Sequence, residues 1–218
     1  MLRLYVDSAS REAAEPLLAT GLFHGLTTNP TLLRREGLRL ADLEELYSWA
    51  TAAGAREVFF QAWGAEVDEL VAAAGALQDI GPRVVTKLPA SKAGASAAAQ
   101  LVSRGHTVLL TAVYSAAQGL LAAAAGAQYV APYLGRMDDA ERNGFEEVLT
   151  MHRTLAAAHR ATEVLVASVR DVETVVALAQ QGVACFALQP EVAEQLFQEP
   201  LTAAAVEVFE ADARRVAS

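Results

Sequence analysis

The sequence has little cysteine and little positive charge. It contains one cysteine, so no disulfide can form within the chain, and we expect a reducing compartment. Its 17 basic residues are outnumbered by 26 acidic residues, which gives a formal net charge of -9. Nucleic acids and anionic membrane surfaces both favour a basic face, so we expect neither as a partner.

Long hydrophobic runs are also missing. No uninterrupted apolar run reaches the roughly 18 residues that a membrane-spanning helix needs. The most apolar stretch, residues 116–134, is broken by glutamine, glycine and proline. The apolar segment at the N-terminus is too short to be the core of a signal peptide. We therefore expect a soluble, cytoplasmic, globular protein.

What the sequence contains instead is an alternation of strand and helix patterns. The expected strands cover residues 2–7, 25–28, 57–63, 83–88, 106–112, 128–132, 163–168 and 183–188. The expected helices start near residue 10 and then cover about 40–53, 66–78, 91–104, 115–125, 144–159 and 172–180, with helix from about residue 189 to the end. Such an alternation predicts a parallel sheet with right-handed crossovers.

Two parallel architectures compete for this pattern. An open doubly wound sheet usually has a glycine-rich phosphate turn after its first strand, and the segment Asp7-Ser8-Ala9-Ser10 has none. About eight strand–helix units in 218 residues fit a compact barrel. The sequence therefore predicts an α/β protein with one (β/α)8 TIM-barrel domain over residues 1–218. Its last helix, at about residues 202–216, is additional to the barrel.

Polar residues stand at the end of nearly every expected strand, where barrel enzymes carry their chemistry. They are Asp7, Thr27, Thr28, Asn29, Gln61, Lys87, Thr111, Tyr133, Arg136, Ser168 and Gln189. The sequence assigns no role to Gln189.

Lys87 is the most informative of these residues. It is one of only two lysines and lies in an apolar strand. Burial there would lower the pKa of its amine and leave a neutral nucleophile that can form a Schiff base with a carbonyl. An ion-paired lysine at a strand end is the alternative, and the residues alone leave both open. Lys92, the other lysine, falls in the first turn of a helix, where we expect a surface position.

The neighbouring polar residues also have two interpretations each. Asp7 could move protons or hold Lys87, or it could cap a helix. Asn29 could orient a substrate hydroxyl, but a turn residue before Pro30 is the favoured interpretation from position alone. Gln61 could position a water molecule. Thr111 and Tyr133 have hydroxyls suited to the same water, although each alone is typical of a core residue.

Arg136 and Ser168 suggest an anion site. Arginine binds phosphate with two parallel hydrogen bonds, and the loops after the last strands of these barrels commonly hold phosphate. The alternative for Arg136 is a salt bridge with Asp138 or Asp139. The four histidines lack metal-ligand spacing, and Cys185 fits a core position. We expect no metal and no organic cofactor.

Taken together, these motifs resemble the small transaldolase-like class I aldolases, most closely the fructose-6-phosphate aldolase branch. The resemblance extends nearly from end to end. It is carried by Thr27-Thr28-Asn29-Pro30, by Val84-Val85-Thr86-Lys87-Leu88-Pro89, by Thr111-Ala112-Val113-Tyr114, by Tyr129-Val130-Ala131-Pro132-Tyr133 with Arg136, and by Leu165-Val166-Ala167-Ser168.

The resemblance implies a role for each matching position. Lys87 would form the Schiff base, and Asp7 and Asn29 would contact the lysine and the sugar hydroxyls. Gln61, Thr111 and Tyr133 would hold a water molecule that carries protons. Arg136 and Ser168 would bind the phosphate. Thr28 and Ala131 would contact the substrate.

Two positions separate the branches of this family. Its transaldolases usually have glutamate at the position of Gln61 and phenylalanine at that of Tyr133, so both residues follow the aldolase pattern. Residues 134–139 look more like the transaldolase branch. The resemblance implies a lyase that cleaves fructose 6-phosphate into dihydroxyacetone and glyceraldehyde 3-phosphate.

Two alternatives remain, and the resemblance also implies an assembly. A transaldolase would transfer the dihydroxyacetone unit from fructose 6-phosphate or sedoheptulose 7-phosphate to an aldose phosphate, in the pentose phosphate pathway of carbohydrate metabolism. A barrel that binds sugar phosphates without catalysis is an alternative of another class. The family implies a homo-oligomer, a decamer of two pentameric rings, in which the C-terminal helix packs on a neighbouring subunit.

Overall fold

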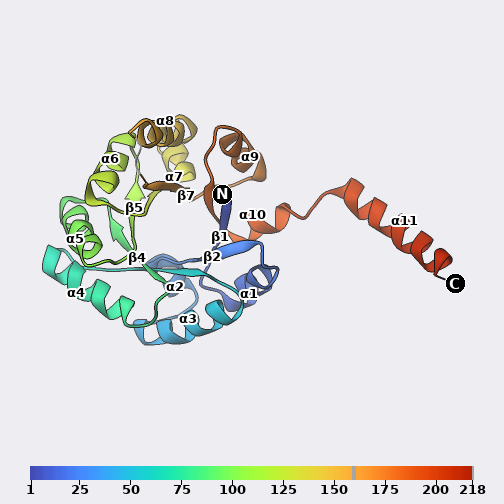
Figure 1. The fold of residues 1–218 in the computed structure, drawn as a ribbon, viewed down its shortest axis with the longest axis horizontal. Coiled ribbons are helices and arrows are strands. Elements are labelled where there is room, and N and C mark those ends of the chain that lie inside the picture. The colour runs from blue at the N-terminus through green and yellow to red at the C-terminus, as the bar shows by residue number, and fades with distance from the viewer. Residues whose placement is uncertain (159–160, 218) are drawn as a thin grey trace.

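A computed structural model of the chain describes residues 1–158 and 161–217. Its eight parallel strands pair in chain order, and β8 pairs with β1, which closes the sheet into a barrel (Figure 1). The strands are β1 (Arg3–Asp7), β2 (Phe23–Thr27), β3 (Glu57–Gln61), β4 (Val84–Pro89), β5 (Val108–Val113), β6 (Tyr129–Pro132), β7 (Glu163–Val166) and β8 (Cys185–Leu188). The predicted (β/α)8 barrel is confirmed.

Helices connect successive strands and surround the barrel, and two more follow the last strand. They are α1 (Arg11–Ala19), α2 (Pro30–Arg35), α3 (Leu43–Ala52), α4 (Val67–Gln78), α5 (Lys92–Ser103), α6 (Ala116–Ala125), α7 (Leu134–Asp139), α8 (Gly144–Ala157), α9 (Val172–Gln180), α10 (Pro190–Gln195) and α11 (Pro200–Val216), with a 3₁₀ turn, η1 (Leu40–Asp42), before α3. None of the helices in the described part of the chain has both the length and the apolar character to cross a membrane.

Two helices, α2 and α7, were not predicted from the sequence. Each has only six residues, too few to show the periodicity of a longer helix. The segment after residue 189, expected to be helical, holds two helices, α10 and α11, and α11 matches the last helix expected at about residues 202–216. The helix expected over residues 144–159 is described as far as Ala157, and residue 159 lies outside the described residues.

Side chains along each strand point alternately into the barrel and towards the helices. On β4, Val84 and Leu88 belong to the core between sheet and helices, whereas Val85 belongs to the cluster inside the barrel. Lys87 shares the inward parity of Val85 and therefore faces the barrel axis. The inner cluster consists of Tyr5, Phe59, Val85, Leu109, Tyr129, Ala131, Leu165, Cys185 and Ala187. As expected, Cys185 is a buried core residue.

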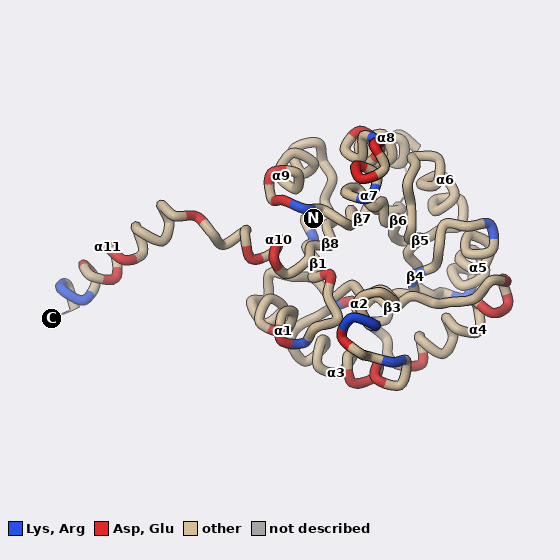
Figure 2. Tube along the Cα trace, turned by 180° about the vertical axis from the view of Figure 1, so that it is seen from behind, with Lys and Arg blue, Asp and Glu red and all other residues tan. Residues whose placement is uncertain are grey.

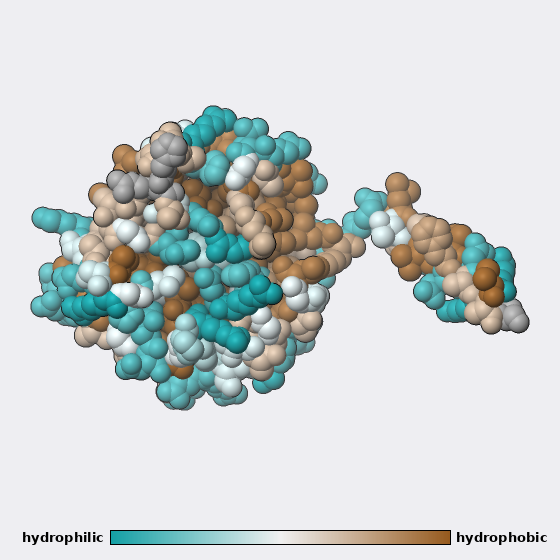
Figure 3. All heavy atoms as spheres, viewed as in Figure 1, coloured by the Kyte–Doolittle hydropathy of each residue, from teal (hydrophilic) through white to brown (hydrophobic). Residues whose placement is uncertain are grey.

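The helix α11 lies apart from the barrel (Figure 1). It carries the exposed apolar side chains Leu201, Val206, Val208, Phe209 and Val216. Apolar atoms on α11 and on the side of the barrel that faces it are brown in Figure 3. Acidic positions occur along the helix, and its last turn carries Arg214 and Arg215 (Figure 2). The monomer therefore leaves an amphipathic helix without a packing surface.

Candidate active site

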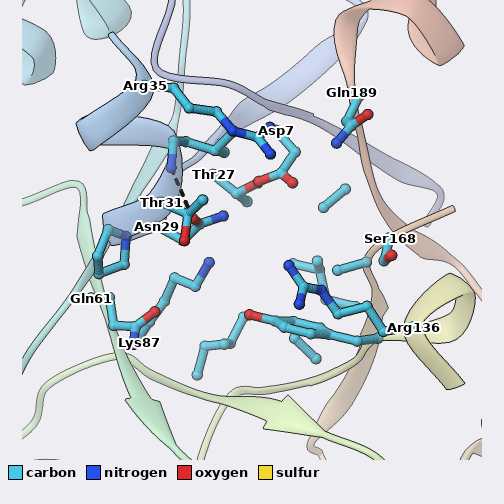
Figure 4. Close-up of a pocket in the computed structure, with 18 residues that line it drawn as sticks. Asp7, Thr27, Asn29, Thr31, Arg35, Gln61, Lys87, Arg136, Ser168 and Gln189 are labelled. Carbon is cyan, nitrogen blue, oxygen red and sulfur yellow. Dashed lines mark hydrogen bonds between the residues drawn. The ribbon is translucent and has the colours of Figure 1, made fainter. Parts of the chain in front are cut away.

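A cavity of about 440 Å³ opens at the carboxyl ends of the strands. Most of the residues that the sequence analysis selected line it, and Figure 4 shows them converging from different strands. They are Asp7, Thr27, Asn29, Gln61, Lys87, Ala131, Tyr133, Arg136 and Ser168. Thr28 and Thr111 do not line the cavity but bind residues that do, as described below.

Lys87 lies at the bottom of the cavity and is only 5% exposed. Its Nζ donates a hydrogen bond of 2.7 Å to the backbone carbonyl of Thr28. Burial lowers the pKa of this amine, because the charged form loses its hydration, and the negative charge of Asp7 opposes the shift. The net effect is a lowered pKa, so a larger fraction of Lys87 is in the neutral, nucleophilic form at a given pH.

Asp7, at the end of β1, faces Lys87 across the cavity. Its carboxylate accepts a hydrogen bond of 2.7 Å from Thr27 Oγ1. Burial raises the pKa of Asp7, while Lys87 and the Thr27 hydroxyl oppose this. Burial thus moves the pKa values of the acid and the amine towards each other, which is typical of groups that exchange protons. The N-cap of α1 is Ser10, three residues after Asp7, so the cap alternative is wrong for Asp7.

Asn29 has both a structural position at the start of a helix and a place in the cavity wall. It caps α2, because its side-chain oxygen accepts a hydrogen bond of 3.0 Å from the backbone N–H of Leu32, and it also lines the cavity. Its amide NH2 remains as a donor for a ligand. Thr28 acts mainly through its backbone: its carbonyl holds Lys87, and its own hydroxyl donates to the carbonyl of Phe59 at 2.8 Å.

Gln61 ends β3, Thr111 lies on β5, and Tyr133 follows β6 directly as the N-cap of α7. Gln61 pairs in register with Lys87 between β3 and β4. Tyr133 lines the cavity and its hydroxyl lies 2.7 Å from Thr111 Oγ1. Burial raises the pKa of the Tyr133 phenol, so it stays protonated and able to donate. Thr111 is fully buried and therefore orients Tyr133 rather than touching a ligand itself.

Arg136 and Ser168 are brought together by the start of α7. The backbone N–H of Gly135 donates to the carbonyl of Ser168 at 2.9 Å, and a Cβ on Gly135 would lie 2.5 Å from that oxygen. Only glycine allows this approach. Ser168 has a left-handed φ of 59°, a conformation that is uncommon outside glycine and often found at functional sites.

The salt-bridge alternative for Arg136 is wrong. Asp139 pairs with Arg170, and the Asp138 carboxylate accepts the N–H of Gly144. Arg136 instead lies over the ring of Tyr133, with its Cζ 5.9 Å from the ring centroid. Its guanidinium reaches into the cavity (Figure 4), where it can bind an anion.

The cavity also has lining residues that sequence reasoning did not assign, among them Thr31, Arg35 and Gln189. Gln189 stands at the end of β8, and it was noted without a role. Arg35 lies on α2, a helix that was not expected. The only signal for it was the pair Arg34-Arg35 shortly after the Thr-Thr-Asn-Pro motif, in a chain poor in basic residues.

No group of three or more histidine, cysteine, aspartate or glutamate side chains within residues 1–158 and 161–217 could hold a metal ion. The polar groups of the cavity are instead one amine, one carboxylate, two guanidiniums, amides and hydroxyls. This set suits carbonyl chemistry on a polyhydroxylated anion.

The sequence matches a family profile described as Transaldolase/Fructose-6-phosphate aldolase over residues 4–217. The chain belongs to this family. A probable transaldolase of Phenylobacterium zucineum is 32% identical over 212 residues, which covers 97% of this chain and 96% of the relative. A probable transaldolase of Methanococcus maripaludis is 34% identical over 211 residues and covers 97% of both chains.

Solved structures with the same barrel have other activities. A mandelate oxidase matches with a TM-score of 0.58 and 16% identity, and the match covers 87% of this chain and 65% of that one. A flavocytochrome b2 matches with a TM-score of 0.60 and 13% identity, over 88% of this chain and 57% of that one. At such identities the likeness shows the fold alone.

Proposed function

We propose that this member of the family is a class I aldolase that cleaves ketose phosphates, with fructose 6-phosphate as donor. The observation that carries the proposal is the buried Lys87, whose pKa is lowered, at the bottom of a cavity with an arginine at its mouth. The cleavage products are dihydroxyacetone and glyceraldehyde 3-phosphate.

The first steps build the Schiff base. The neutral amine of Lys87 attacks the keto carbon of the open-chain sugar to give a carbinolamine, which loses water and becomes an iminium ion. The iminium draws electrons from the bond between the third and fourth carbons. As that bond breaks, the fourth-carbon hydroxyl loses its proton, and Asp7 is the nearest carboxylate that can accept it.

The remaining steps release the three-carbon unit. The aldehyde phosphate leaves, and an enamine stays on Lys87. Protonation of the enamine carbon regenerates the iminium, and hydrolysis frees dihydroxyacetone. Tyr133 suits the proton delivery because its phenol is protonated and is oriented by Thr111, while the Gln61 amide can hold the intervening water.

A transaldolase is the second candidate, and the names of the relatives favour it. In that reaction the enamine attacks a second aldehyde, such as erythrose 4-phosphate, before water releases it. Gln61 and Tyr133 favour cleavage, because the resemblance places glutamine and tyrosine at these two positions in the aldolase branch. Both candidates share every step up to the enamine.

Borohydride trapping tests the Schiff base. Wild-type protein incubated with dihydroxyacetone and borohydride should gain the mass of the reduced adduct on the peptide that contains Lys87. Lys87→Met should give no adduct and no turnover while keeping the far-ultraviolet circular dichroism of a folded barrel, and Lys92→Met should behave like wild type. The absence of any adduct in the wild type would favour the non-catalytic binding barrel.

Product analysis separates the two candidates. Fructose 6-phosphate alone should yield free dihydroxyacetone if the protein is an aldolase. Transaldolase activity would be established instead if sedoheptulose 7-phosphate formed when erythrose 4-phosphate was added and no free dihydroxyacetone appeared with or without it.

The proposal also includes a homo-oligomer. The support is α11, whose exposed apolar face has no partner in the monomer. A neighbouring subunit is the surface that would bury it, and the decamer of two pentameric rings follows from the family resemblance.

A further inference from the structure

The cavity has a second arginine that the proposed chemistry does not use. Arg35 is the last residue of α2 and lines the cavity. The helix that carries it is fixed to the reactive centre, because Asn29 caps α2 and the adjacent Thr28 carbonyl binds Lys87. Arg35 therefore has a defined position relative to the lysine.

Arg35 and Arg136 stand on opposite walls of the mouth. Arg35 follows β2 and Arg136 follows β6, and in the closed order of eight strands these two are half-way round the barrel from each other. In Figure 4 their side chains reach into the cavity from opposite sides.

The charges of the cavity are unusual for this chain. The protein is acidic, with a net charge of -9, yet the charged residues that line the cavity are Arg35, Lys87, Arg136 and a single carboxylate, Asp7. Within the described ranges, neither Arg35 nor Arg136 forms an ion pair, whereas Arg3, Arg11, Arg39, Arg142, Arg170 and Arg215 each pair with a carboxylate. Other arginines of the described ranges, Arg34 among them, also form no ion pair, but Arg35 and Arg136 are the ones that line the cavity as well, so their position and their charge both suit a ligand.

We propose that Arg35 is a specificity-determining residue that binds the phosphate of the substrate from the wall opposite Arg136 and Ser168. The inference rests on the proposed function and refines it. A phosphate monoester carries close to two negative charges at neutral pH, and two guanidiniums balance that charge where one would not. Arg35 would therefore select phosphorylated sugars and aldehydes over their unphosphorylated counterparts.

Arg34 provides a matched control. It is the neighbouring residue on α2 with the same charge, but it lines a separate apolar groove rather than the cavity. Arg35→Gln and Arg34→Gln therefore change the net charge equally and differ only in which surface loses its cation.

The experiment compares phosphorylated and unphosphorylated ligands. Arg35→Gln should raise KM for fructose 6-phosphate about tenfold or more, the usual effect of losing one charge-assisted hydrogen bond. Its KM for fructose and its borohydride adduct with dihydroxyacetone should match the wild type. Arg34→Gln should leave all three unchanged, and Arg35→Lys should recover part of the loss.

A binding measurement keeps the test independent of catalysis. Glucitol 6-phosphate has no carbonyl, so it cannot form a Schiff base, and its Kd by calorimetry should rise about tenfold in Arg35→Gln but not in Arg34→Gln. Equal losses for glucitol and glucitol 6-phosphate, or no loss in Arg35→Gln, would overturn the role of Arg35. A missing dihydroxyacetone adduct in the wild type would instead overturn the proposed function and leave the binding result standing.

Discussion

The electrostatic pairing of Lys87 and Asp7 gives a pH prediction. The Asp7 charge holds the pKa of Lys87 up against the effect of burial. Asp7→Asn keeps an acceptor for Thr27 but removes that charge, so the pKa of Lys87 should fall further. The neutral amine then appears at lower pH, and the rising limb of adduct formation with pH should move to lower pH.

Cyanoborohydride trapping with dihydroxyacetone across a pH series measures this limb. Asp139→Asn is the control, because that carboxylate pairs with Arg170 away from the cavity lining. A limb that stays in place or moves to higher pH in Asp7→Asn would show that Asp7 does not support the charged form of Lys87.

The position of several strand residues on the cavity could be predicted from the sequence, because the carboxyl ends of all barrel strands meet at the same opening. Lys87, Asp7 and Gln61 illustrate this. The capping role of Asn29 was missed although asparagine before proline is a local signal for a helix start. That Asp139 pairs with Arg170 and not with Arg136 could not be predicted, since Arg170 is distant in the sequence. Arg35 was missed because its helix is too short to show a period.

At the scale of elements, the contact between α7 and the end of β7 positions the phosphate-binding pair. Gly135→Ala should push α7 away from Ser168, because the added Cβ would lie 2.5 Å from the Ser168 carbonyl oxygen. The expected result is a KM for fructose 6-phosphate raised several-fold and a loss of about 1–3 kcal/mol in the free energy of unfolding.

Gly75→Ala is the matched control for this substitution. Gly75 lies within α4, and a Cβ there would meet nothing within 4 Å. Urea unfolding should show an unchanged or slightly raised stability, by about 0.5–1 kcal/mol, because alanine favours the helix. An unchanged KM in a folded Gly135→Ala protein would show that the α7 contact does not position Arg136.

At the scale of the whole molecule, α11 should hold subunits together and contribute little to the barrel. Phe209→Glu places a charge among the exposed apolar residues of the helix, so it should lower the mass measured by light scattering. The barrel should keep its thermal transition if the helix packs only on a neighbour. Glu207→Gln is the control, and an unchanged mass for Phe209→Glu would exclude α11 as the main contact.

The packed interior of the barrel determines the order in which substrates bind and products dissociate. Below Lys87 the axis is filled by an inner layer that includes Tyr5, Phe59 and Tyr129, and the two tyrosine hydroxyls bind Glu57 at the far end. These described residues close the inner end of the cavity, so ligands enter and leave at the carboxyl ends of the strands. The first aldehyde must therefore dissociate through this opening before a second aldehyde can bind, while the enamine stays attached to Lys87. Any two-substrate reaction at Lys87 should accordingly follow ping-pong kinetics.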